Sequence, residues 1–248
     1  MISIKNLTKT YGELTVLNEL SFELDGGVLG VVAPKGSGKT SLLNIIAGVT
    51  APTSGEVVID DAPILDKRKI GYLQEGTPLY ADMTPCEYLL FYGSAKKISK
   101  EKLYRQIDEV FELLGLEGAK NVLIQNLSTS ERQKLGLAST LLGNPSTVLL
   151  DELFSGITTA DVADTKSVIK MLGQIKTVII TSPSLLSIGD VCDKALILSP
   201  EGNVMLESAE EITEEMQKLA SLEAETEETE EIIEAEEVEE TVEEEVEE

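Results

Sequence analysis

Two short segments hold the residue types that phosphate chemistry needs. The first is Ala-Pro-Lys-Gly-Ser-Gly-Lys-Thr at residues 33–40, and the second is Val-Leu-Leu-Asp-Glu at residues 148–152. In the first, backbone N–H groups at a helix N-terminus can cradle phosphates, Lys39 can neutralise them, and Thr40 can offer a hydroxyl to Mg²⁺. In the second, Asp151 would emerge from its strand beside Thr40, and Glu152 could polarise a water molecule. Together they predict a nucleotide site.

The elements around these segments fit that prediction. The apolar run 27–32 indicates a buried strand before the loop, and 38–47 indicates a helix that stops at Gly48. Alternating patterns at 2–7, 16–24 and 55–60 predict strands of a small antiparallel layer.

The rest of the chain alternates helix and strand signals. Helices are expected from Thr84-Pro85, from Ser99 to Gly115, from Ser128 to Gly143 and over 160–172; strands are expected at 147–150, 177–181 and 195–199. The prediction is an α/β fold: a P-loop NTPase core with a mostly parallel sheet, an N-terminal antiparallel layer and an inserted helical subdomain.

Charge separates a C-terminal segment from the rest. From Glu207 onward there are 21 Glu and one Lys, so this segment carries most of the net charge of −25. We expect a domain at 1–206 with its helical subdomain at about 84–143, a helix at 207–222 that starts at a Ser208–Glu211 capping box, and a disordered acidic tail at 223–248. The tail either keeps the protein in solution or docks on a basic partner.

Composition also bounds location and partners. Cys86 and Cys192 lie far apart, which favours a reducing compartment, and we find neither a signal peptide pattern nor an apolar run of about 18 residues that could span a bilayer. The cytoplasm is therefore expected. An acidic chain without a basic footprint argues against nucleic acid as a partner.

The sequence resembles the nucleotide-binding subunit of an ATP-binding cassette (ABC) transporter over about residues 2–206. The matching stretches are 7–12, 33–40, 42–48, 52–57, 70–73, 127–128, 144–145, 148–152 and 192–194. This resemblance implies ATP and Mg²⁺ as cofactors, a separate integral membrane permease subunit and a second ABC cassette as partners, and a place at the inner face of the cell membrane. The segment 80–92 is where relatives accept a helix of the membrane subunit, and packing within the helical block explains most of its apolar residues equally well.

The resemblance also assigns site residues. Glu152 and Lys39 are implied as catalytic, and Tyr11 as the residue that stacks on adenine. The nucleotide-binding set is Tyr11, Pro34, Lys35, Gly36, Ser37, Gly38, Lys39, Thr40 and Ser41. The Mg²⁺ set is Thr40, Gln74, Glu75 and Asp151, where either Gln74 or Glu75 acts through water. The signature that faces a partner cassette is Ser128, Thr129, Ser130 and Glu131.

Two departures from the family pattern concern backbone freedom. Ala33 replaces the first loop glycine, which would cost roughly 1 kcal/mol if that position needed a positive φ. The signature Leu-Ser-Gly-Gly-Gln reads Leu-Ser-Thr-Ser-Glu at 127–131, so both glycines carry side chains. Ser128 and Glu131 also form a complete capping box, so a purely structural role is equally supported.

Two further departures concern catalysis. Pro183 stands at the position of the switch histidine in a chain without any His, and Thr158 replaces an Asp that links subunits in the family. Losing a positioned polar group typically lowers a rate by about 10²- to 10⁴-fold. The leading interpretation is an ATP-hydrolysing transporter subunit with weakened turnover; the alternative is an impaired regulatory or scaffold subunit paired with a competent cassette.

Overall fold

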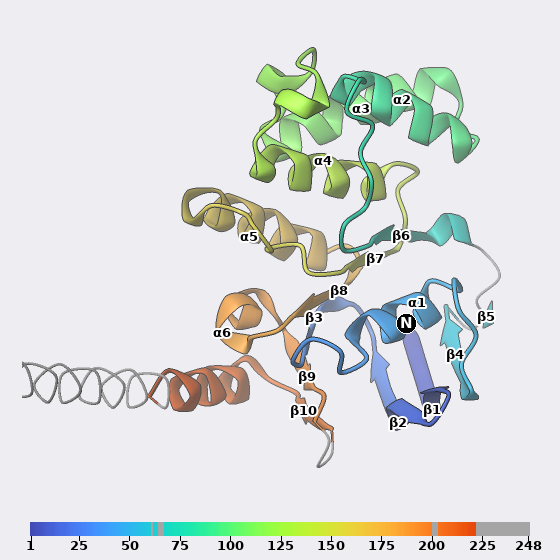
Figure 1. Ribbon diagram of the computed structural model, residues 1–248, viewed down its shortest axis with the longest axis vertical. Helices are drawn as coiled ribbons and strands as arrows, with labels where there is room; N and C mark the ends of the chain where they lie inside the picture. Colours follow the sequence, from blue (N-terminus) through green and yellow to red (C-terminus); the bar gives the residue numbers. More distant parts are fainter. Residues whose placement is uncertain (61, 64–66, 200–202, 222–248) are drawn as a thin grey trace, which may run out of the picture.

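Two sheets and a layer of helices make up the protein (Figure 1). The computed structural model describes residues 1–60, 62–63, 67–199 and 203–221. The strands are β1 Ile2–Tyr11, β2 Leu14–Leu24, β3 Gly27–Val32, β4 Ser54–Ile59, β5 Ala62–Pro63, β6 Ile70–Leu73, β7 Thr147–Leu150, β8 Thr177–Ser182, β9 Lys194–Ile197 and β10 Val204–Leu206. The helices are α1 Lys39–Ile46, α2 Pro85–Ala95, α3 Lys100–Leu114, α4 Thr129–Leu141, α5 Thr159–Gly173 and α6 Leu185–Ile188, followed by a helix at 209–221.

The six-stranded sheet forms the centre, in the order β10-β9-β3-β8-β7-β6. Its strands run parallel except β10, which pairs antiparallel with β9. Alternate residues of β3 point to opposite faces, so Val28 and Val32 pack towards α5 and α6 while Leu29 and Val31 pack towards α1. Burial on both faces explains why this strand is an uninterrupted apolar run.

The second sheet is antiparallel, in the order β2-β1-β4-β5. Its apolar residues share one core with α1, which lies between the two sheets (Figure 1). The predicted antiparallel layer is confirmed, but β1 runs on to Tyr11 and β2 starts at Leu14. Pairing across the turn between them extends both strands through polar residues that the alternating pattern left out.

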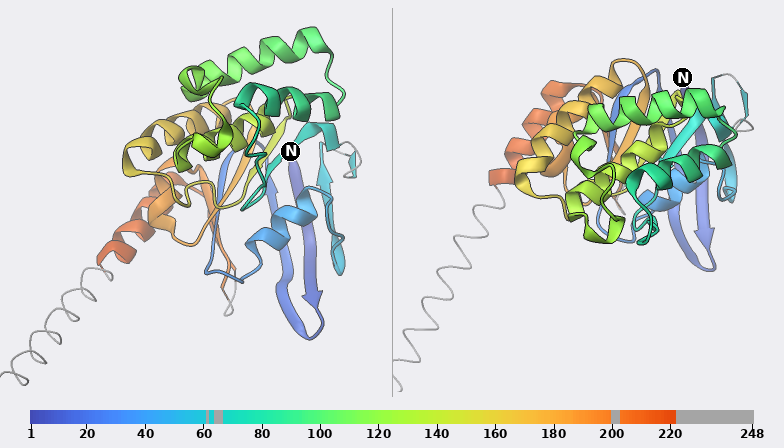
Figure 2. Two further views of the ribbon diagram at one scale, coloured as in Figure 1. Left: turned by 45° about the horizontal axis from the view of Figure 1, so that its top comes forward. Right: turned by 90° about the horizontal axis from the view of Figure 1, so that it is seen from above.

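Helices α4 and α5 pack on the other side of the central sheet, and α2 and α3 stack on α4 to complete a helical layer (Figure 2). The predicted helix starts are confirmed: Thr84 and Ser128 form capping boxes, and Ser99 is the N-cap of α3. Gly115 ends α3 in the left-handed conformation with φ of 65°, as expected for a C-terminal glycine.

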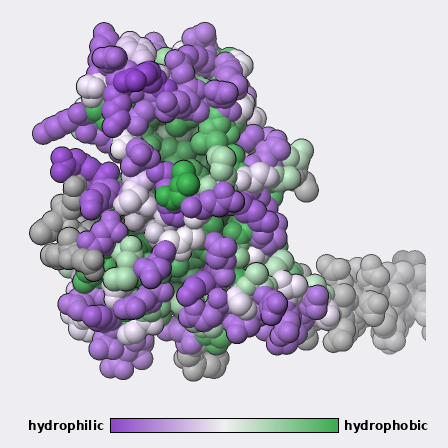
Figure 3. Space-filling model, turned by 180° about the vertical axis from the view of Figure 1, so that it is seen from behind, coloured by the Kyte–Doolittle hydropathy of each residue, from purple (hydrophilic) through white to green (hydrophobic). Residues whose placement is uncertain are grey.

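The last described helix begins after Ser208, whose Oγ accepts the N–H of Glu211 at 3.2 Å. It packs through Ile212, which is only 1% exposed, and Met216. The predicted tail at 223–248 and Leu222 lie outside the described residues. Seen from behind, hydrophilic residues cover most of this face, and apolar residues gather beneath the helical layer (Figure 3). In the part of the chain that the structure describes, no helix has the length and apolar character to cross a membrane.

Candidate functional site

The phosphate loop joins the end of β3 to the start of α1. Gly36 and Gly38 have φ of 86° and 94°, which glycine adopts without strain. A Cβ on Gly38 would also lie 2.5 Å from the carbonyl oxygen of Val16. Ala33 has no positive φ, so the cost considered for that position does not arise, and its N–H donates to the Ser182 carbonyl at 3.3 Å.

Lys39 folds back over its own loop and meets Glu152. Its Nζ lies 3.1 Å from Glu152 Oε1, and it donates to the carbonyls of Ala33 at 2.5 Å and Pro34 at 3.2 Å. Lys39 is 6% exposed and Glu152 8%. A pair this well buried is attracted strongly, because little water screens it.

One hydroxyl connects the Asp151 carboxylate to the backbone of Glu152. Thr181, in β8, donates to Asp151 Oδ1 at 2.7 Å and accepts the backbone N–H of Glu152 at 2.9 Å. Glu152 itself has φ of 53°, a left-handed conformation that is uncommon for a residue with a side chain. This turn directs the Glu152 carboxylate to Lys39, while the Asp151 carboxylate stays buried and bonded to Thr181.

A cavity of about 190 Å³ opens at this point. It is lined by Lys35, Gly36, Gly38, Lys39, Thr40, Ser41, Glu75 and Glu152. The structure thus brings the phosphate-loop residues and Glu152 to one place. Pro34, Ser37, Tyr11, Gln74 and Asp151 do not line it.

Of the two residues that were alternatives for the glutamine position, Glu75 lines this cavity. Gln74 instead donates from Nε2 to Asn44 Oδ1, in α1, at 3.2 Å. The hydroxyl of Tyr72 donates to the same oxygen at 3.3 Å. Burial, with the negative charge of Asp151, raises the pKa of Tyr72, so this hydroxyl stays a proton donor.

Tyr11 lies at the end of β1, beside the first turn of α1. Its hydroxyl is 3.4 Å from Ser41 Oγ, and Lys9 Nζ sits 4.8 Å from the ring centroid. Tyr11 is 49% exposed. A half-exposed aromatic residue next to a phosphate loop is suited to stacking on a base.

The residues fit a divalent cation and phosphates. Oδ2 of Asp151 is buried without a hydrogen-bond partner, and such an unsatisfied oxygen typically costs about 1–3 kcal/mol unless a ligand engages it. Among the described residues there is no cluster of three or more His, Cys, Asp or Glu suited to a metal. Mg²⁺ in nucleotide sites usually needs only one or two carboxylates together with phosphate oxygens and water.

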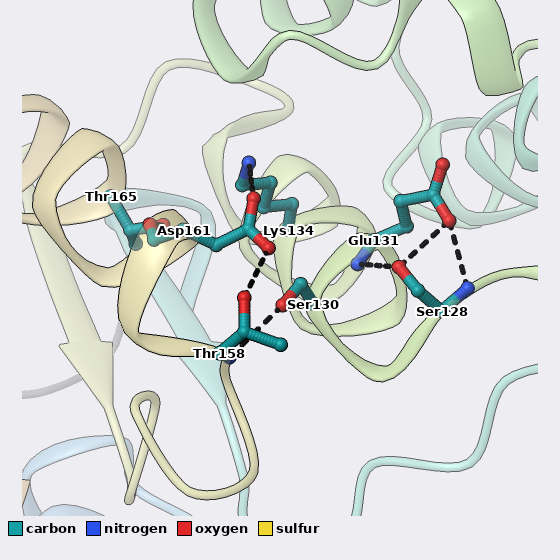
Figure 4. A network of polar contacts seen from close by, with 7 residues as sticks. All are labelled: Ser128, Ser130, Glu131, Lys134, Thr158, Asp161 and Thr165. Atoms are coloured by element: carbon teal, nitrogen blue, oxygen red, sulfur yellow. Dashed lines mark hydrogen bonds and ion pairs between the residues drawn. The ribbon is translucent and has the colours of Figure 1, made fainter.

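The signature segment is engaged within the chain (Figure 4). Ser128 Oγ accepts the N–H of Glu131 at 3.1 Å and donates to its carboxylate at 2.8 Å. Ser130, which is 3% exposed, accepts the N–H of Thr158 at 3.3 Å. The structure shows the capping box, and it shows partners for these polar groups inside the same chain.

The same network links α4 to the start of α5. Thr158 donates to Asp161 Oδ2 at 2.8 Å, and Lys134 Nζ pairs with Asp161 Oδ1 at 2.9 Å. Lys134, Thr158 and Ser130 lower the pKa of Asp161 to about 2. Thr129 is exposed at this end of α4.

Sequence reasoning missed Thr181 and Asn44. The sequence pattern places Thr181 at the end of a strand and Asn44 in a stretch that matches the family, and neither pattern indicates a contact in the site. One signal could have found Thr181. It is a polar residue at the carboxyl end of β8, and β8 runs parallel to β7, the strand that Asp151 follows, so both strands end at the same edge of the sheet.

The loop, the acidic pair and the two sheets define a nucleotide-binding protein of the P-loop type. The family model "ABC transporter" matches residues 17–155, which is more than half of the chain. An uncharacterized ABC transporter ATP-binding protein of Methanocaldococcus jannaschii is 33% identical over 224 residues, covering 90% of this chain and 83% of the relative. The chain belongs to the ABC transporter family.

Solved structures agree. The dimeric post-hydrolysis state of the ATP-binding cassette MJ0796, bound to ADP and Pi, has a TM-score of 0.73 and 26% identity, over 83% of this chain and 99% of that one. The structure of cbiO1 from Clostridium perfringens, part of the transporter complex cbiONQ, has a TM-score of 0.77 at 18% identity, over 87% of this chain and 91% of that one. The latter supports the fold.

The predicted α/β fold and family are therefore confirmed. The protein is an ATP-binding subunit of an ABC transporter and an ABC-type ATPase. The alternative, an impaired regulatory subunit, is not favoured by these relatives.

Proposed function

We propose that the chain hydrolyses Mg-ATP with Lys39 and Glu152 as its catalytic residues. The observation that carries this is the placement of both in one cavity, Nζ to Oε1 at 3.1 Å, at the mouth of a phosphate loop. A cation that already holds a carboxylate can exchange it for phosphate oxygens. Glu152, once released, is then positioned to accept a proton from a water molecule.

The remaining roles follow from placement. The N–H groups of the loop, with Lys35 and Ser41 at its sides, bind phosphates, and Tyr11 stacks on adenine. Thr40 and Asp151 hold Mg²⁺, with Glu75 reaching it through water. Bound Mg²⁺ would neutralise charge on the phosphates. Thr181 keeps Asp151 oriented for this, and Asn44 fixes the side chain of Gln74 through a hydrogen bond.

Two surfaces suit the partners that the family implies. A cavity of about 290 Å³ lies between the glutamine loop and α4, lined by Leu73, Leu79 and Gly136 among others. Beside it Tyr80 packs edge-on against Phe91, and each is 51% exposed. This surface takes a helix of a membrane permease subunit, which places the chain at the cytoplasmic face of the membrane.

The second surface is the signature end of α4, which faces another ABC cassette. Its polar groups have partners within the chain, and Pro183 occupies the switch position, so we expect weak turnover. We also propose that residues 1–206 form the ATP-binding domain, with a helical subdomain at about 84–143 and a separate C-terminal helix at 207–222.

The test is Mg-ATP hydrolysis by the subunit in its membrane complex, compared with the complex that carries Glu152→Gln. Removing the proton acceptor should lower the rate by about 10²-fold or more while ATP still binds. Lys39→Met should abolish ATP binding. An unchanged rate in the Glu152→Gln complex would contradict hydrolysis by this chain and support the regulatory role.

A further inference from the structure

A basic cavity lies away from the nucleotide site, where the α2–α3 loop meets the end of α4. Its volume is about 630 Å³, and Arg68, Lys96, Lys97 and Lys102 are among its lining residues. None of the described Asp or Glu residues lines it. The protein has a net charge of −25, so a cavity lined by four cationic side chains is unlike the chain as a whole.

Two of these cations are free to take a ligand. Lys97 and Lys102 are exposed and have no ion pair or hydrogen bond from their side chains among the described residues. Lys96 is fixed differently, because its Nζ donates to the carbonyls of Leu142 at 3.0 Å and Ser139 at 3.4 Å. Burial lowers the pKa of Lys96 to about 8, so a nearby anion would stabilise its charged form.

Apolar residues also line the cavity. Ala95, Ile98 and Leu142 contribute to its lining. Its occupant should therefore combine negative charge with small aliphatic groups. A plain inorganic anion would leave this apolar surface unused.

The chain itself contains such an occupant. Residues 223–248 hold 16 Glu and no Lys or Arg, interrupted by Ile232, Ile233, Val238, Val242 and Val246. We propose that this acidic tail docks in the basic cavity of its own chain, with glutamates on Lys97 and Lys102 and an aliphatic residue against Ile98 and Leu142. This goes beyond nucleotide binding and does not rest on it.

Reach and concentration favour the tail over a free anion. Residues 222–248 can extend roughly 90 Å at about 3.3 Å per residue, whereas a globular chain of about 220 residues is roughly 45 Å across. A tethered segment has an effective concentration of the order of mM for a site that it can reach. An anion from solution would approach a protein of strongly negative charge.

The experiment is cleavage of the full chain by a protease specific for Glu, followed by mass spectrometry of the tail peptides. At about 20 mM salt, Lys97→Gln/Lys102→Gln should be cut in its tail about threefold faster than wild type, because the tail is released. The matched control Lys5→Gln/Lys170→Gln removes two exposed lysines elsewhere and should behave like wild type. At about 0.5 M salt all three should be equal.

Carbodiimide cross-linking of the wild-type chain, mixed with ¹⁵N-labelled chain, supplies the second readout. Links from Lys97 or Lys102 to tail glutamates within one chain support the proposal; links only between chains overturn it. Equal tail cleavage in the two double variants also overturns it. A third result would also overturn the proposal: phosphatidylglycerol vesicles bind in a way that depends on Lys97 and Lys102, and the wild-type tail is cut freely. That result would assign the cavity to lipid headgroups.

Discussion

The phosphate-loop site and the start of α4 differ in whether their polar groups have partners within the chain. At the phosphate loop, Asp151 keeps a buried oxygen without a partner, and Lys39 is held by a carboxylate that it can exchange. At the start of α4, Ser128 and Ser130 have their partners within the chain. The first region is arranged for a ligand, and the second is arranged to hold itself together.

The largest effect on the free energy of unfolding is expected for Lys39→Met, which tests the phosphate-loop site. Glu152 would be left buried without its cation, and losing one member of a buried pair costs about 3 kcal/mol. The free energy of unfolding in urea measures it. In Lys39→Met/Glu152→Gln the uncompensated charge is gone, so the double variant should be more stable than Lys39→Met. A double variant that is no better would show that the pair does not act as a unit.

Thr181→Val comes next in size. It removes the hydroxyl shared by Asp151 and the Glu152 N–H, and we expect a loss of about 2 kcal/mol in the free energy of unfolding. Thr177→Val, in the same strand, is the matched control, because no side-chain hydrogen bond of Thr177 is found among the described residues. Equal losses in urea melts would contradict the bridging role of Thr181.

Much of the fold could be predicted because its signals are local. The apolar runs of β3 and β7 gave their bounds, and the caps Thr84, Ser99 and Ser128 act within a few residues. The short edge strands β5 and β10 were missed, because pairing with a neighbour defines them more than their own composition does.

The sequence predicted which residues form the site, but it did not predict which of them contact one another. Lys39 and Glu152 were both expected, but their ion pair joins residues more than a hundred positions apart. Thr181 escaped notice for the same reason, since a strand pattern does not reveal which neighbouring carboxylate a hydroxyl contacts.

Ser128→Ala tests the second region, the start of α4. The loss of an N-cap typically costs about 1 kcal/mol, so the thermal midpoint should fall slightly. Because this segment is self-contained, the ATP affinity of the isolated subunit should not change, as titration calorimetry would show. A weakened affinity would mean that the two regions are coupled within one chain.

The smallest effect concerns Asp161, whose pKa is lowered from 3.8 to about 2, chiefly by Lys134. A depressed carboxyl pKa stabilises the folded state above the unfolded pKa, and this is lost as pH falls towards the folded pKa. Between pH 4 and pH 2 the Tm of wild type should therefore fall more steeply than that of Asp161→Asn. Parallel curves from scanning calorimetry would exclude a contribution from this pair.

The Lys39–Glu152 contact has one more consequence. Glu152 is a counterion of Lys39 within the chain, so a nucleotide that binds Lys39 must displace this carboxylate. In the role of general base that we propose for Glu152, neutralising this carboxylate should tighten ATP binding while slowing hydrolysis. A nucleotide that binds Lys39 would at the same time release Glu152 for that role.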